Sequence, residues 1–383
     1  MDFNLNNEQK NLRDRVRALA LEHIAPHAAF WDEQETFPSE AIARLAEEGL
    51  LGMTVPREYG GLGLDPLSYV VVLEEIARYD GSTALTLTSH NTLACGHLKR
   101  AGTPEQKQLY LPRMASGKML GAWALSEAQT GSDAASIRTV AQRSGDRWIL
   151  RGSKMFVTQG SVAGIYILMA RSAAGEKRHQ GISAFLVEAG TEGLQIGQKL
   201  KKMGCRASDT TSLVLHDVDL PPEALLGEEG AAFADLMALL AQGRTGIAAM
   251  AVGIARGCLE EALSYARRRR QFEQPIGKAQ AIQWMLADMA TEIDAARMLV
   301  WRAAEKIQSG EPCTREAAMA KLYASEVATR AANTALQIHG GYGYLRNLPV
   351  ERYLRDAKAC ELGEGTSEMQ RLVIARDLLG KLS

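Results

Sequence analysis

The sequence predicts an α+β protein in which two helical regions flank a central region of short strands. Residues 1–120 carry apolar side chains at helical spacing, and residues 121–230 contain short β-branched and aromatic runs with a period of two. Helical periodicity returns over residues 231–383. A chain of 383 residues has room for two or three domains, so we assign one domain to each range.

The first region is expected to be an N-terminal helical domain. Leu12, Val16 and Leu19 recur on one helical face. Asp65 followed by Pro66 is typical of a helix start, because an aspartate can accept from first-turn N–H groups and proline fits the first helical position. A long apolar run follows, so a helix is expected from about residue 66.

The central region is expected to form an antiparallel β-domain. Its candidate strands are WILRGSKMFVTQG, GIYILMARS, GISAFLVEAG and SLVLHDVDLP, separated by glycine, serine or charged residues. No GxGxxG motif follows any of these strands, which disfavours a dinucleotide-binding βαβ fold.

The last region is expected to be a bundle of four or more long helices. One apolar stripe consists of Ile282, Met285, Leu286, Met289, Ile293 and Ala296. The most apolar stretch, residues 246–254, is too short to cross a bilayer and predicts a buried helix.

Charge and cysteine content exclude several classes of function. The 44 basic and 45 acidic residues give a net charge of −1, so neither nucleic acid nor an anionic membrane is expected as a partner. The 5 cysteines form no CxxC pair, which favours reduced thiols in a cytosolic or matrix-like compartment. His23 and His27 are separated by Pro26 and have no evident carboxylate partner, so no metal site is predicted. The polar N-terminus lacks the features of a secretory signal.

Two segments of the central region are candidates for binding a ligand. In ALSEAQTGSDAAS (124–136), an apolar run gives way to hydroxyls, glycine and an aspartate, which can bind a polar ring or a phosphate. In KMFVTQG (154–160), Phe156 and Thr158 lie two apart and share a face of a strand, where they can hold a flat heterocycle. A solvated turn and an ordinary sheet face are the alternatives.

Two segments of the last region form a candidate pyrophosphate site. RRRRQF (267–272) supplies arginines, and QIHGG (337–341) supplies two glycines that allow close approach of the backbone. The alternatives are a solvated helix C-terminus and a turn between helices.

Glu364 is a candidate general base. It lies between Gly363 and Gly365, where a thin backbone can approach a ligand, and burial would raise its pKa. Ser367 and Gln370 match a capping box, which predicts a helix from about residue 368, and that helix N-terminus would favour the anion. The alternative is a solvated loop glutamate.

Taken together, these segments resemble the acyl-CoA dehydrogenase family. ALSEAQTGSDAAS, KMFVTQG, YARRRRQF, QIHGGYGY and RDAKACELGEGTSEMQRLVIAR occur in the family's order and spacing over essentially the whole chain. The resemblance implies an N-terminal helical domain, a central β-domain and a C-terminal four-helix bundle, with FAD held non-covalently between subunits. It also implies a cytoplasmic homotetramer, an oxidoreductase of fatty acid β-oxidation type that passes electrons to an electron-transfer flavoprotein.

The resemblance assigns site residues by position. The residues expected to bind FAD are Trp123, Ala124, Leu125, Ser126, Ser132, Phe156, Val157, Thr158, Arg269, Gln271, Phe272, Gln280, Gln337, Ile338, His339, Gly340, Gly341, Thr366, Ser367 and Glu368. Those from 269–272 and 337–341 would reach the FAD of a neighbouring subunit. The residues expected near the substrate are Ser132, Gln242, Arg244, Gly363 and Gly365.

Glu364 matches the family's catalytic base. The resemblance implies that it takes an α-proton from an acyl-CoA thioester while the β-carbon gives a hydride to FAD, which yields a trans-2-enoyl thioester. A flavin ribityl hydroxyl and the backbone N–H of Glu364 would polarise the thioester carbonyl. Some members place the base at the position of Gly243, which cannot serve here. Straight-chain members commonly carry a bulky aromatic residue at the position of Gly363, so we expect room for short, branched, cyclic or aryl acyl groups.

Other activities on this fold remain as alternatives. An oxidase, or an enzyme acting on a carrier-protein thioester, uses the same chemistry. Glu364 disfavours the nitroalkane oxidases, which have an aspartate there, and the desulfinases, which lack the carboxylate. The near-neutral charge disfavours a non-catalytic protein that binds nucleic acid. Segment 83–97, expected to form a pocket wall, contains no arginine and disfavours a dicarboxylate such as glutaryl.

Overall fold

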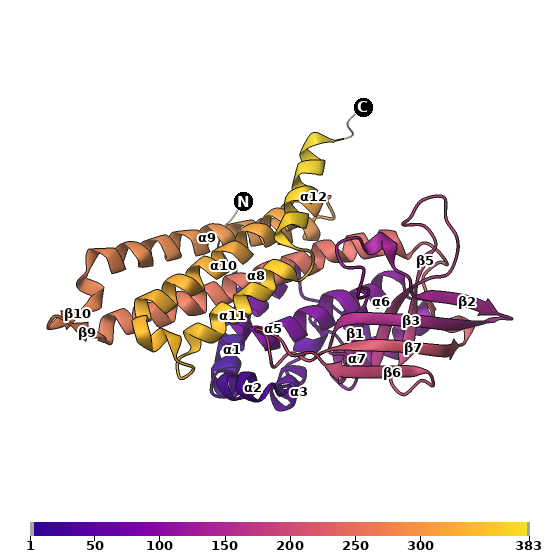
Figure 1. Ribbon diagram of the computed structural model, residues 1–383, viewed down its shortest axis with the longest axis horizontal. Coiled ribbons are helices and arrows are strands. Elements are labelled where there is room, and N and C mark those ends of the chain that lie inside the picture. The colour runs from indigo at the N-terminus through magenta and orange to yellow at the C-terminus, as the bar shows by residue number, and fades with distance from the viewer. Residues whose placement is uncertain (1–3, 381–383) are drawn as a thin grey trace.

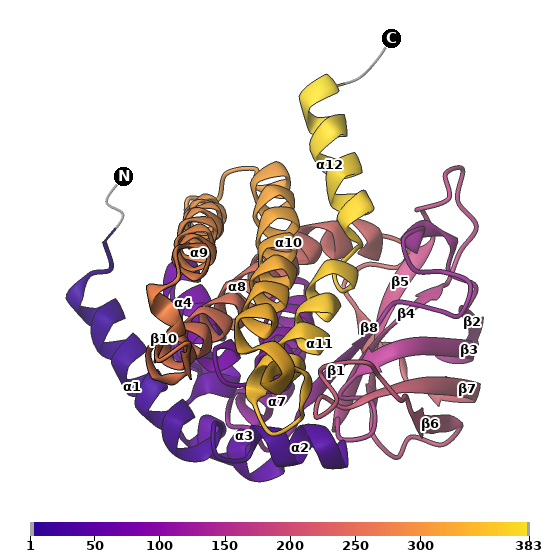
Figure 2. The ribbon, with the colours of Figure 1, turned by 60° about the vertical axis from the view of Figure 1, so that its left-hand side comes forward.

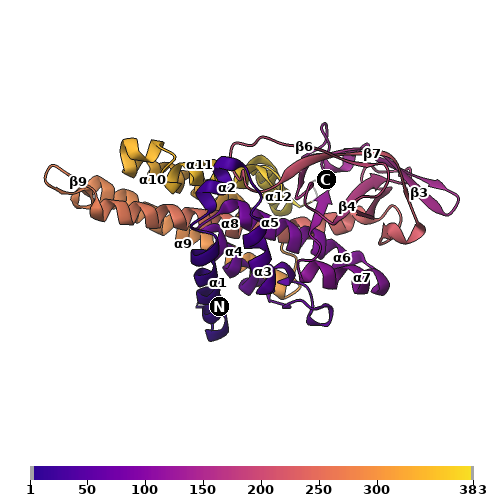
Figure 3. The ribbon, with the colours of Figure 1, turned by 90° about the horizontal axis from the view of Figure 1, so that it is seen from below.

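A computed structural model describes residues 4–380 of the chain. Helices form the first and last parts, and a sheet lies between them in sequence and at one end of the molecule in space (Figure 1). The N-terminal helices lie against the lower side of the long C-terminal helices (Figure 2), and the view from below shows the sheet beyond the end of those helices (Figure 3). The predicted order of helices, strands and helices is confirmed.

The N-terminal region consists of seven α-helices. They are α1 Asn7–His23, α2 Ala28–Gln34, α3 Ser39–Glu47, α4 Pro66–Ala77, α5 Gly81–Thr88, α6 Cys95–Ala101 and α7 Pro104–Ala115, with a π-helical segment Ser89–Ala94 between α5 and α6. The predicted start at Asp65 is confirmed, since its side chain accepts a hydrogen bond from the Ser68 N–H and Pro66 occupies the first turn. Within α1, Val16 is fully buried, and Leu12 and Leu19 pack beside it.

The central region is a sheet of eight strands. They are β1 Gly121–Ala124, β2 Val140–Ser144, β3 Arg147–Thr158, β4 Ile165–Arg171, β5 Ile182–Glu188, β6 Leu194–Lys199, β7 Thr210–Leu220 and β8 Leu225–Leu226. Their order is β6-β7-β3-β2-β4-β5-β8, with β1 also paired to β4. Along β4, side chains alternate between two cores: Ile165 and Ile167 pack toward α6 and α7, and Tyr166 and Leu168 face the opposite core.

The sheet differs from the prediction in two respects. It is mixed, because β1 and β2 each pair with β4 in parallel, although its other pairings are antiparallel as expected. Strand β3 also carries an extra residue between Lys154 and Val157, where Phe156 has a positive φ of 58°. This β-bulge interrupts the regular alternation from which Phe156 and Thr158 were expected to share a face.

The C-terminal region consists of five α-helices. They are α8 Ala232–Arg268, α9 Gln280–Gln308, α10 Thr314–His339, α11 Pro349–Leu362 and α12 Ser367–Leu379, and a small hairpin of β9 Arg270–Gln271 and β10 Gln274–Pro275 joins α8 to α9. Helices α8 to α11 pack together as the predicted bundle. Helix α8 is long and apolar enough to cross a membrane, but 78% of its most apolar window is buried inside the protein, as expected for a core helix.

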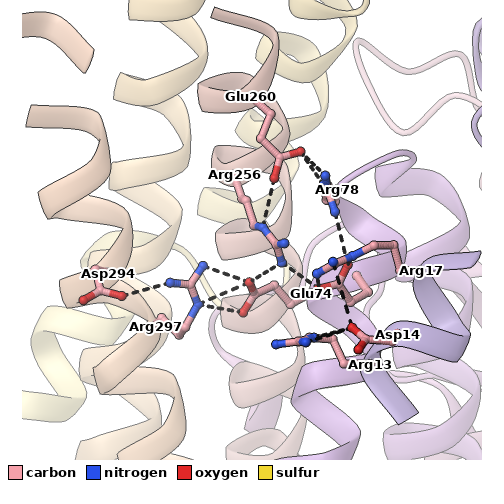
Figure 4. A network of polar contacts seen from close by, with 10 residues as sticks. Arg13, Asp14, Arg17, Glu74, Arg78, Arg256, Glu260, Asp294 and Arg297 are labelled. Carbon is pink, nitrogen blue, oxygen red and sulfur yellow. Dashed lines mark hydrogen bonds and ion pairs between the residues drawn. The ribbon is translucent and has the colours of Figure 1, made fainter. Parts of the chain in front are cut away.

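A network of ten charged side chains joins the N-terminal helices to the bundle (Figure 4). Its centre is the pair Glu74 and Glu75 on α4, both buried. Glu75 contacts Arg17 of α1 at 3.0 Å and Arg256 of α8 at 2.7 Å, and Glu74 contacts Arg297 of α9 at 2.9 Å. The remaining members are Arg13, Asp14, Arg78, Glu260 and Asp294. The network contains five acidic and five basic groups, so its formal charges cancel. Each of the two buried carboxylates, Glu74 and Glu75, has a cationic partner.

Asp356 lies where the three regions meet. It is fully buried on α11, and its Oδ1 accepts a hydrogen bond from the backbone N–H of Cys205, in the central region, at 2.6 Å. A Cβ added at Gly81 of α5 would lie 3.2 Å from Asp356 Oδ2. Burial raises the pKa of Asp356 to about 7, and the nearby carboxylate of Asp80 adds to this rise.

We expect Asp356→Asn to flatten the dependence of stability on pH. The folded state holds the Asp356 proton more tightly than the unfolded chain does, so this stabilising contribution is complete below the ordinary pKa and is lost as pH rises through about 7. Asparagine cannot ionise and still accepts from Cys205. The melting temperature of the variant should therefore fall less than that of the wild type between about pH 5 and about pH 8. If the melting temperatures of Asp356→Asn and the wild type changed in parallel with pH, the raised pKa of Asp356 would be contradicted.

Candidate active site

Glu364 lies on a tight loop between α11 and α12. Both Glu364 and Gly365 have positive φ, 55° and 92°, and the first is unfavourable for a residue with a side chain. Surrounding side chains fix the backbone of this loop. Lys321 Nζ donates to the carbonyls of Glu361 at 2.9 Å and Gly365 at 2.7 Å, and Gln370 Nε2 donates to the carbonyls of Glu364 at 3.2 Å and Gly365 at 2.8 Å.

The helix predicted from about residue 368 is confirmed as α12, which begins at Ser367, but its cap differs from the prediction. The N-cap is Thr366, whose hydroxyl accepts from the Met369 N–H. The predicted capping box of Ser367 and Gln370 does not form, because the Gln370 side chain turns back to the Glu364 loop. Ser367 is buried and its hydroxyl has no partner within residues 4–380, whereas Glu368 is exposed.

The carboxylate of Glu364 packs against Gly243 of α8. A Cβ added at Gly243 would lie 2.7 Å from Glu364 Oε2, so only glycine leaves room for the acid in this position. The Oε2 atom is buried and receives no hydrogen bond from any described residue. Burial raises the pKa of Glu364 to about 7, although the positive charges of Arg244 and Lys321 act in the opposite direction.

Of the residues expected near the substrate, Gln242 and Arg244 lie beside Gly243, and Gly363 and Gly365 lie in the loop on either side of Glu364. Arg244 is buried, with its Nε 3.5 Å from the backbone carbonyl of Glu364, and Gln242 is half-buried. Gly363 ends α11, and an added Cβ there would meet only one atom, the carbonyl oxygen of Ala359 at 3.4 Å.

One helical turn further along α8 lies a wall of which the sequence predicted only the segment 83–97. A Cβ added at Gly246 would lie 2.7 Å from Thr88 Cγ2, 3.0 Å from the Tyr69 hydroxyl and 3.5 Å from Leu73 Cδ1. Tyr69 is buried and its hydroxyl has no hydrogen-bond partner among the described residues. Two glycines three residues apart on α8 thus allow close packing: Gly243 lies against Glu364, and Gly246 lies against α4 and α5. Thr88 lies in the segment 83–97 that was expected to form a pocket wall.

The two candidate segments of the central region lie side by side. The Ser126 carbonyl accepts from the Met155 N–H at 2.9 Å, next to Phe156. Lys154, fully buried, donates to the Leu125 carbonyl at 3.1 Å and pairs with Glu127 at 2.9 Å.

The other predicted flavin residues of these segments differ in exposure. Trp123 donates from its indole nitrogen to His97 Nδ1 at 3.1 Å. Phe156 is 66% exposed and Ser132 lies exposed on the loop after β1. Ala124 and Val157 are buried in the sheet, and Thr158 is half-buried. The structure thus brings residues 123–126 and 156–158 together and leaves Ser132 at the surface.

The two arginine and glycine segments form a pocket of about 350 Å³ at the far end of the bundle. Of the predicted FAD residues, its lining includes Arg269, Gln271, Ile338, His339, Gly340 and Gly341. The lining also includes two aromatic residues that the sequence did not suggest. Tyr265 stacks on the His339 ring with centroids 4.2 Å apart, and Arg269 lies 5.2 Å from the centre of the Tyr342 ring.

The remaining predicted residues of this group lie outside the lining. Phe272 is 95% exposed, Gln337 is exposed, and Gln280 is the first residue of α9. The aromatic ring of Phe272 is therefore almost completely exposed on the surface of the chain.

Helix α8 separates this pocket from Glu364. Gly243 and Arg268 are on the same uninterrupted helix, which ends at Arg268 just before Arg269. Their separation along the helix axis is about 37 Å at 1.5 Å per residue. Residues 269–272 and Glu364 of one chain are thus too far apart to surround the same reacting group.

Comparison with known proteins identifies the family. Three models describe the acyl-CoA dehydrogenase N-terminal, middle and C-terminal domains, and they match residues 6–118, 122–218 and 230–379. The chain belongs to the acyl-CoA dehydrogenase family. It is therefore an FAD-dependent oxidoreductase that acts on an acyl-CoA. Our boundaries at residues 120 and 230 and the roles of individual site residues stay predictions.

Several relatives are similar over their whole length. The short-chain specific acyl-CoA dehydrogenase of Clostridium acetobutylicum is 44% identical over 98% of this chain and 99% of its own. The structure of butyryl-CoA dehydrogenase from Megasphaera elsdenii is 41% identical, with a TM-score of 0.96 over 99% of this chain and 100% of that one. A chain from a structural study of the electron transferring flavoprotein of Acidaminococcus fermentans is 42% identical, with a TM-score of 0.97 and complete coverage of both chains.

The residues at the end of the bundle suit the phosphates and adenosine of FAD. Arg269 has no carboxylate partner in the described part of the chain, so its guanidinium is available to an anion. A Cβ added at Gly340 or Gly341 would meet nothing within 4 Å, which leaves the backbone open to close approach. The His339 ring is held by Tyr265 and by the Ala335 carbonyl, 2.7 Å from its Nδ1.

Proposed function

We propose that Glu364 is the catalytic base of a dehydrogenase for short acyl-CoA thioesters. Its unpartnered carboxylate oxygen and the absence of a side chain at Gly243 beneath it support this role. A carboxylate whose pKa is raised to about 7 by burial is a stronger base than an exposed one and is still substantially ionised at neutral pH. Together with the exclusion of water, this favours removal of a weakly acidic α-proton.

The residues around Glu364 have separate tasks in this proposal. Arg244 and Gln370 contact the backbone carbonyl of the base. The Glu364 N–H would donate to the thioester carbonyl, which acidifies the α-proton. Glu364 accepts that proton on its carboxylate. When bound, FAD supplies the acceptor for the hydride that leaves the β-carbon. The segment 123–126, fixed by Lys154 and Met155, and residues 156–158 would hold the flavin ring.

The spacing of Gly243 and Gly246 on α8 favours a short acyl chain. Gly243, beneath the base, and Gly246, beneath the Tyr69 hydroxyl, are three residues apart, which is about 4.5 Å along the helix. An acyl chain whose α-carbon lies at Glu364 would meet Tyr69, Leu73 and Thr88 after one helical turn. This is the observation that carries the proposed substrate class.

Shortening Tyr69 is expected to change the preferred chain length. Tyr69→Ala removes the ring and hydroxyl above Gly246, so octanoyl-CoA should gain relative to butyryl-CoA by about tenfold in kcat/KM. Tyr69→Phe, which removes only the hydroxyl, is the matched control and should keep the preference for the shorter chain. Steady-state assays with both thioesters measure the ratio. An unchanged ratio in Tyr69→Ala would contradict the proposed end of the acyl site.

We also propose that branched or cyclic short acyl groups are accepted, because the space beside Gly363 is open. An anaerobic panel of thioesters, followed by bleaching of the flavin absorbance, tests the proposed function as a whole. Butyryl-CoA, isobutyryl-CoA and a cyclic acyl-CoA should bleach the flavin rapidly. Bleaching by linear thioesters alone, unchanged by Gly363→Tyr, would reject the branched class, and no bleaching by any thioester would reject the proposed function.

We infer that each flavin is shared between two subunits and that the protein is a homotetramer. The distance of about 37 Å along α8 between Gly243 and Arg268 supports the sharing, since both ends carry residues that suit FAD. An exposed aromatic ring such as that of Phe272 is typical of a residue buried in a subunit interface. The mass of the protein in solution, measured by light scattering, tests the assembly.

An electron-transfer flavoprotein is the proposed electron acceptor, and the cytoplasm the proposed location. The similarity to a chain from a study of such a flavoprotein supports the first, and five free cysteines, four of them buried, support a reducing compartment. Reduction of the artificial acceptor ferricenium without release of hydrogen peroxide would separate a dehydrogenase from an oxidase. Activity with carrier-protein thioesters but not with CoA thioesters would favour the carrier-protein alternative.

A further inference from the structure

Lys321 is a fully buried lysine behind the loop of the base. It lies on α10 in a run of small residues, with Ala317, Ala320 and Ala324 buried on the same helix. Burying an ammonium group is costly unless each of its donors is used and its charge has a counterpart. No carboxylate lies within ion-pair distance of Lys321 in residues 4–380, so its position needs another explanation than a salt bridge.

Among residues 4–380, both hydrogen bonds of the Lys321 ammonium go to the segment that carries Glu364. Its ammonium donates to the carbonyl of Glu361, in the last turn of α11, and to the carbonyl of Gly365, directly after the base. These two contacts bracket Glu364 from both sides. They hold a segment in which Glu364, a residue with a side chain, has a positive φ, which is unfavourable unless the surrounding structure fixes it.

The charge of Lys321 also acts on Glu364. The charged and titratable groups that face Glu364 are Arg244 from α8, Lys321 from α10 and Tyr69 from α4. Arg244 and Lys321 are the cations, and they counteract the effect of burial on the pKa of Glu364. Burial in turn lowers the pKa of Lys321 to about 8, so the lysine still carries its charge at neutral pH.

We propose that Lys321 is a positioning residue for the reaction, which holds the strained loop of Glu364 in its reactive conformation and maintains a positive charge behind the base. It acts through Glu364 and does not contact the substrate. Gln370 shares the first task, since it donates to the carbonyls of Glu364 and Gly365, but it has no charge and cannot share the second. This inference rests on the proposed role of Glu364 as the base.

The two tasks can be separated by three variants of the full-length holoprotein. Lys321→Met removes both donors and charge, and Gln370→Leu removes a donor alone. Lys358→Met is the matched control, because Lys358 is a half-exposed lysine on α11 that pairs with the Glu361 carboxylate at 2.6 Å and lies outside the site. The readouts are FAD content, and the pH profile of the rate at which butyryl-CoA bleaches the flavin in anaerobic stopped flow.

Lys321→Met should retain FAD. Its flavin should be bleached at least about tenfold more slowly, because the base is misplaced. The acidic limb of its pH profile should shift upward by about one unit, because a cation near the base is lost. Gln370→Leu should bleach more slowly with the limb unmoved, and Lys358→Met should match the wild type. Bleaching by Lys321→Met within twofold of the wild type, with an unmoved limb, would overturn the proposal.

The proposal can still be tested if Lys321→Met does not fold. If Lys321→Met yields no FAD-containing protein, Lys321→Gln keeps one donor without the charge and should show the upward shift of the limb. If neither folds, Gln370→Leu decides, because an unchanged bleaching rate would refute the claim that these carbonyl contacts hold the loop. A wild type that no acyl-CoA bleaches would count against the proposed function, whereas an active wild type with unaffected variants would count against Lys321 alone.

Discussion

Glu364→Gln should give a yellow, FAD-containing protein that acyl-CoA thioesters scarcely bleach. Glutamine keeps the size of the side chain that packs on Gly243, but it cannot accept a proton at neutral pH. A positioned general base contributes about 10²- to 10⁴-fold, so the rate of flavin reduction should fall by at least the lower value. Anaerobic stopped flow measures that rate.

The matched control is Glu326→Gln on α10, which removes a carboxylate that pairs with Arg371 near the surface. It should reduce its flavin at the wild-type rate. Binding should also survive in Glu364→Gln, seen as a perturbed flavin spectrum on addition of the thioester. Rapid bleaching of Glu364→Gln would remove Glu364 from the role of the base.

Gly243→Ala should be the second most damaging substitution. Its new Cβ would lie 2.7 Å from Oε2 and 2.9 Å from Cδ of Glu364, so the carboxylate has to move. Alanine is also a better helix former than glycine, so the substitution should not weaken the helical structure of α8 itself. We expect flavin reduction to slow by about a hundredfold, the cost of misplacing a catalytic group by about 1 Å.

A second substitution distinguishes displacement of the base from general damage. Glu364→Asp shortens the acid and restores space beside an alanine at 243. The double variant should therefore reduce its flavin faster than the product of the two single effects predicts. Strictly multiplicative effects, or a Gly243→Ala protein as fast as the wild type, would show that Gly243 does not set the position of the carboxylate.

The sequence was sufficient where local chemistry decides the structure. Asp65 and Pro66 define a helix start by themselves, and the change from a period of three to four to a period of two located the sheet. Segments 267–272 and 337–341 were paired from their arginines and glycines, and the structure brings parts of both into one pocket because a helix end and a turn meet there. Their role toward FAD stays a prediction.

The sequence was insufficient where distant elements compete for the same groups. Thr366 caps α12 in place of Ser367 because Gln370, the expected partner in the capping box, is occupied by the Glu364 loop. The parallel pairing of β1 with β4 depends on which edge is free after folding, and no local pattern encodes it. Tyr69 and Lys321 reach the site from α4 and α10. Of the two, only Lys321 could have been noticed in the sequence, as a single charged residue among alanines on one face of a helix.

Helix α8 gives each polypeptide a part in two reaction centres, if flavins are shared as proposed. Its middle, at Gly243, supports the acid of one centre, and its end delivers Arg269 to the next. A substitution at Gly243 would inactivate the active site of the same chain. A substitution at Arg269 would weaken FAD binding in the active site of the neighbouring chain. A chain altered at both places would thus impair two centres in a mixed assembly, whereas two chains with one lesion each could still complete one intact centre between them.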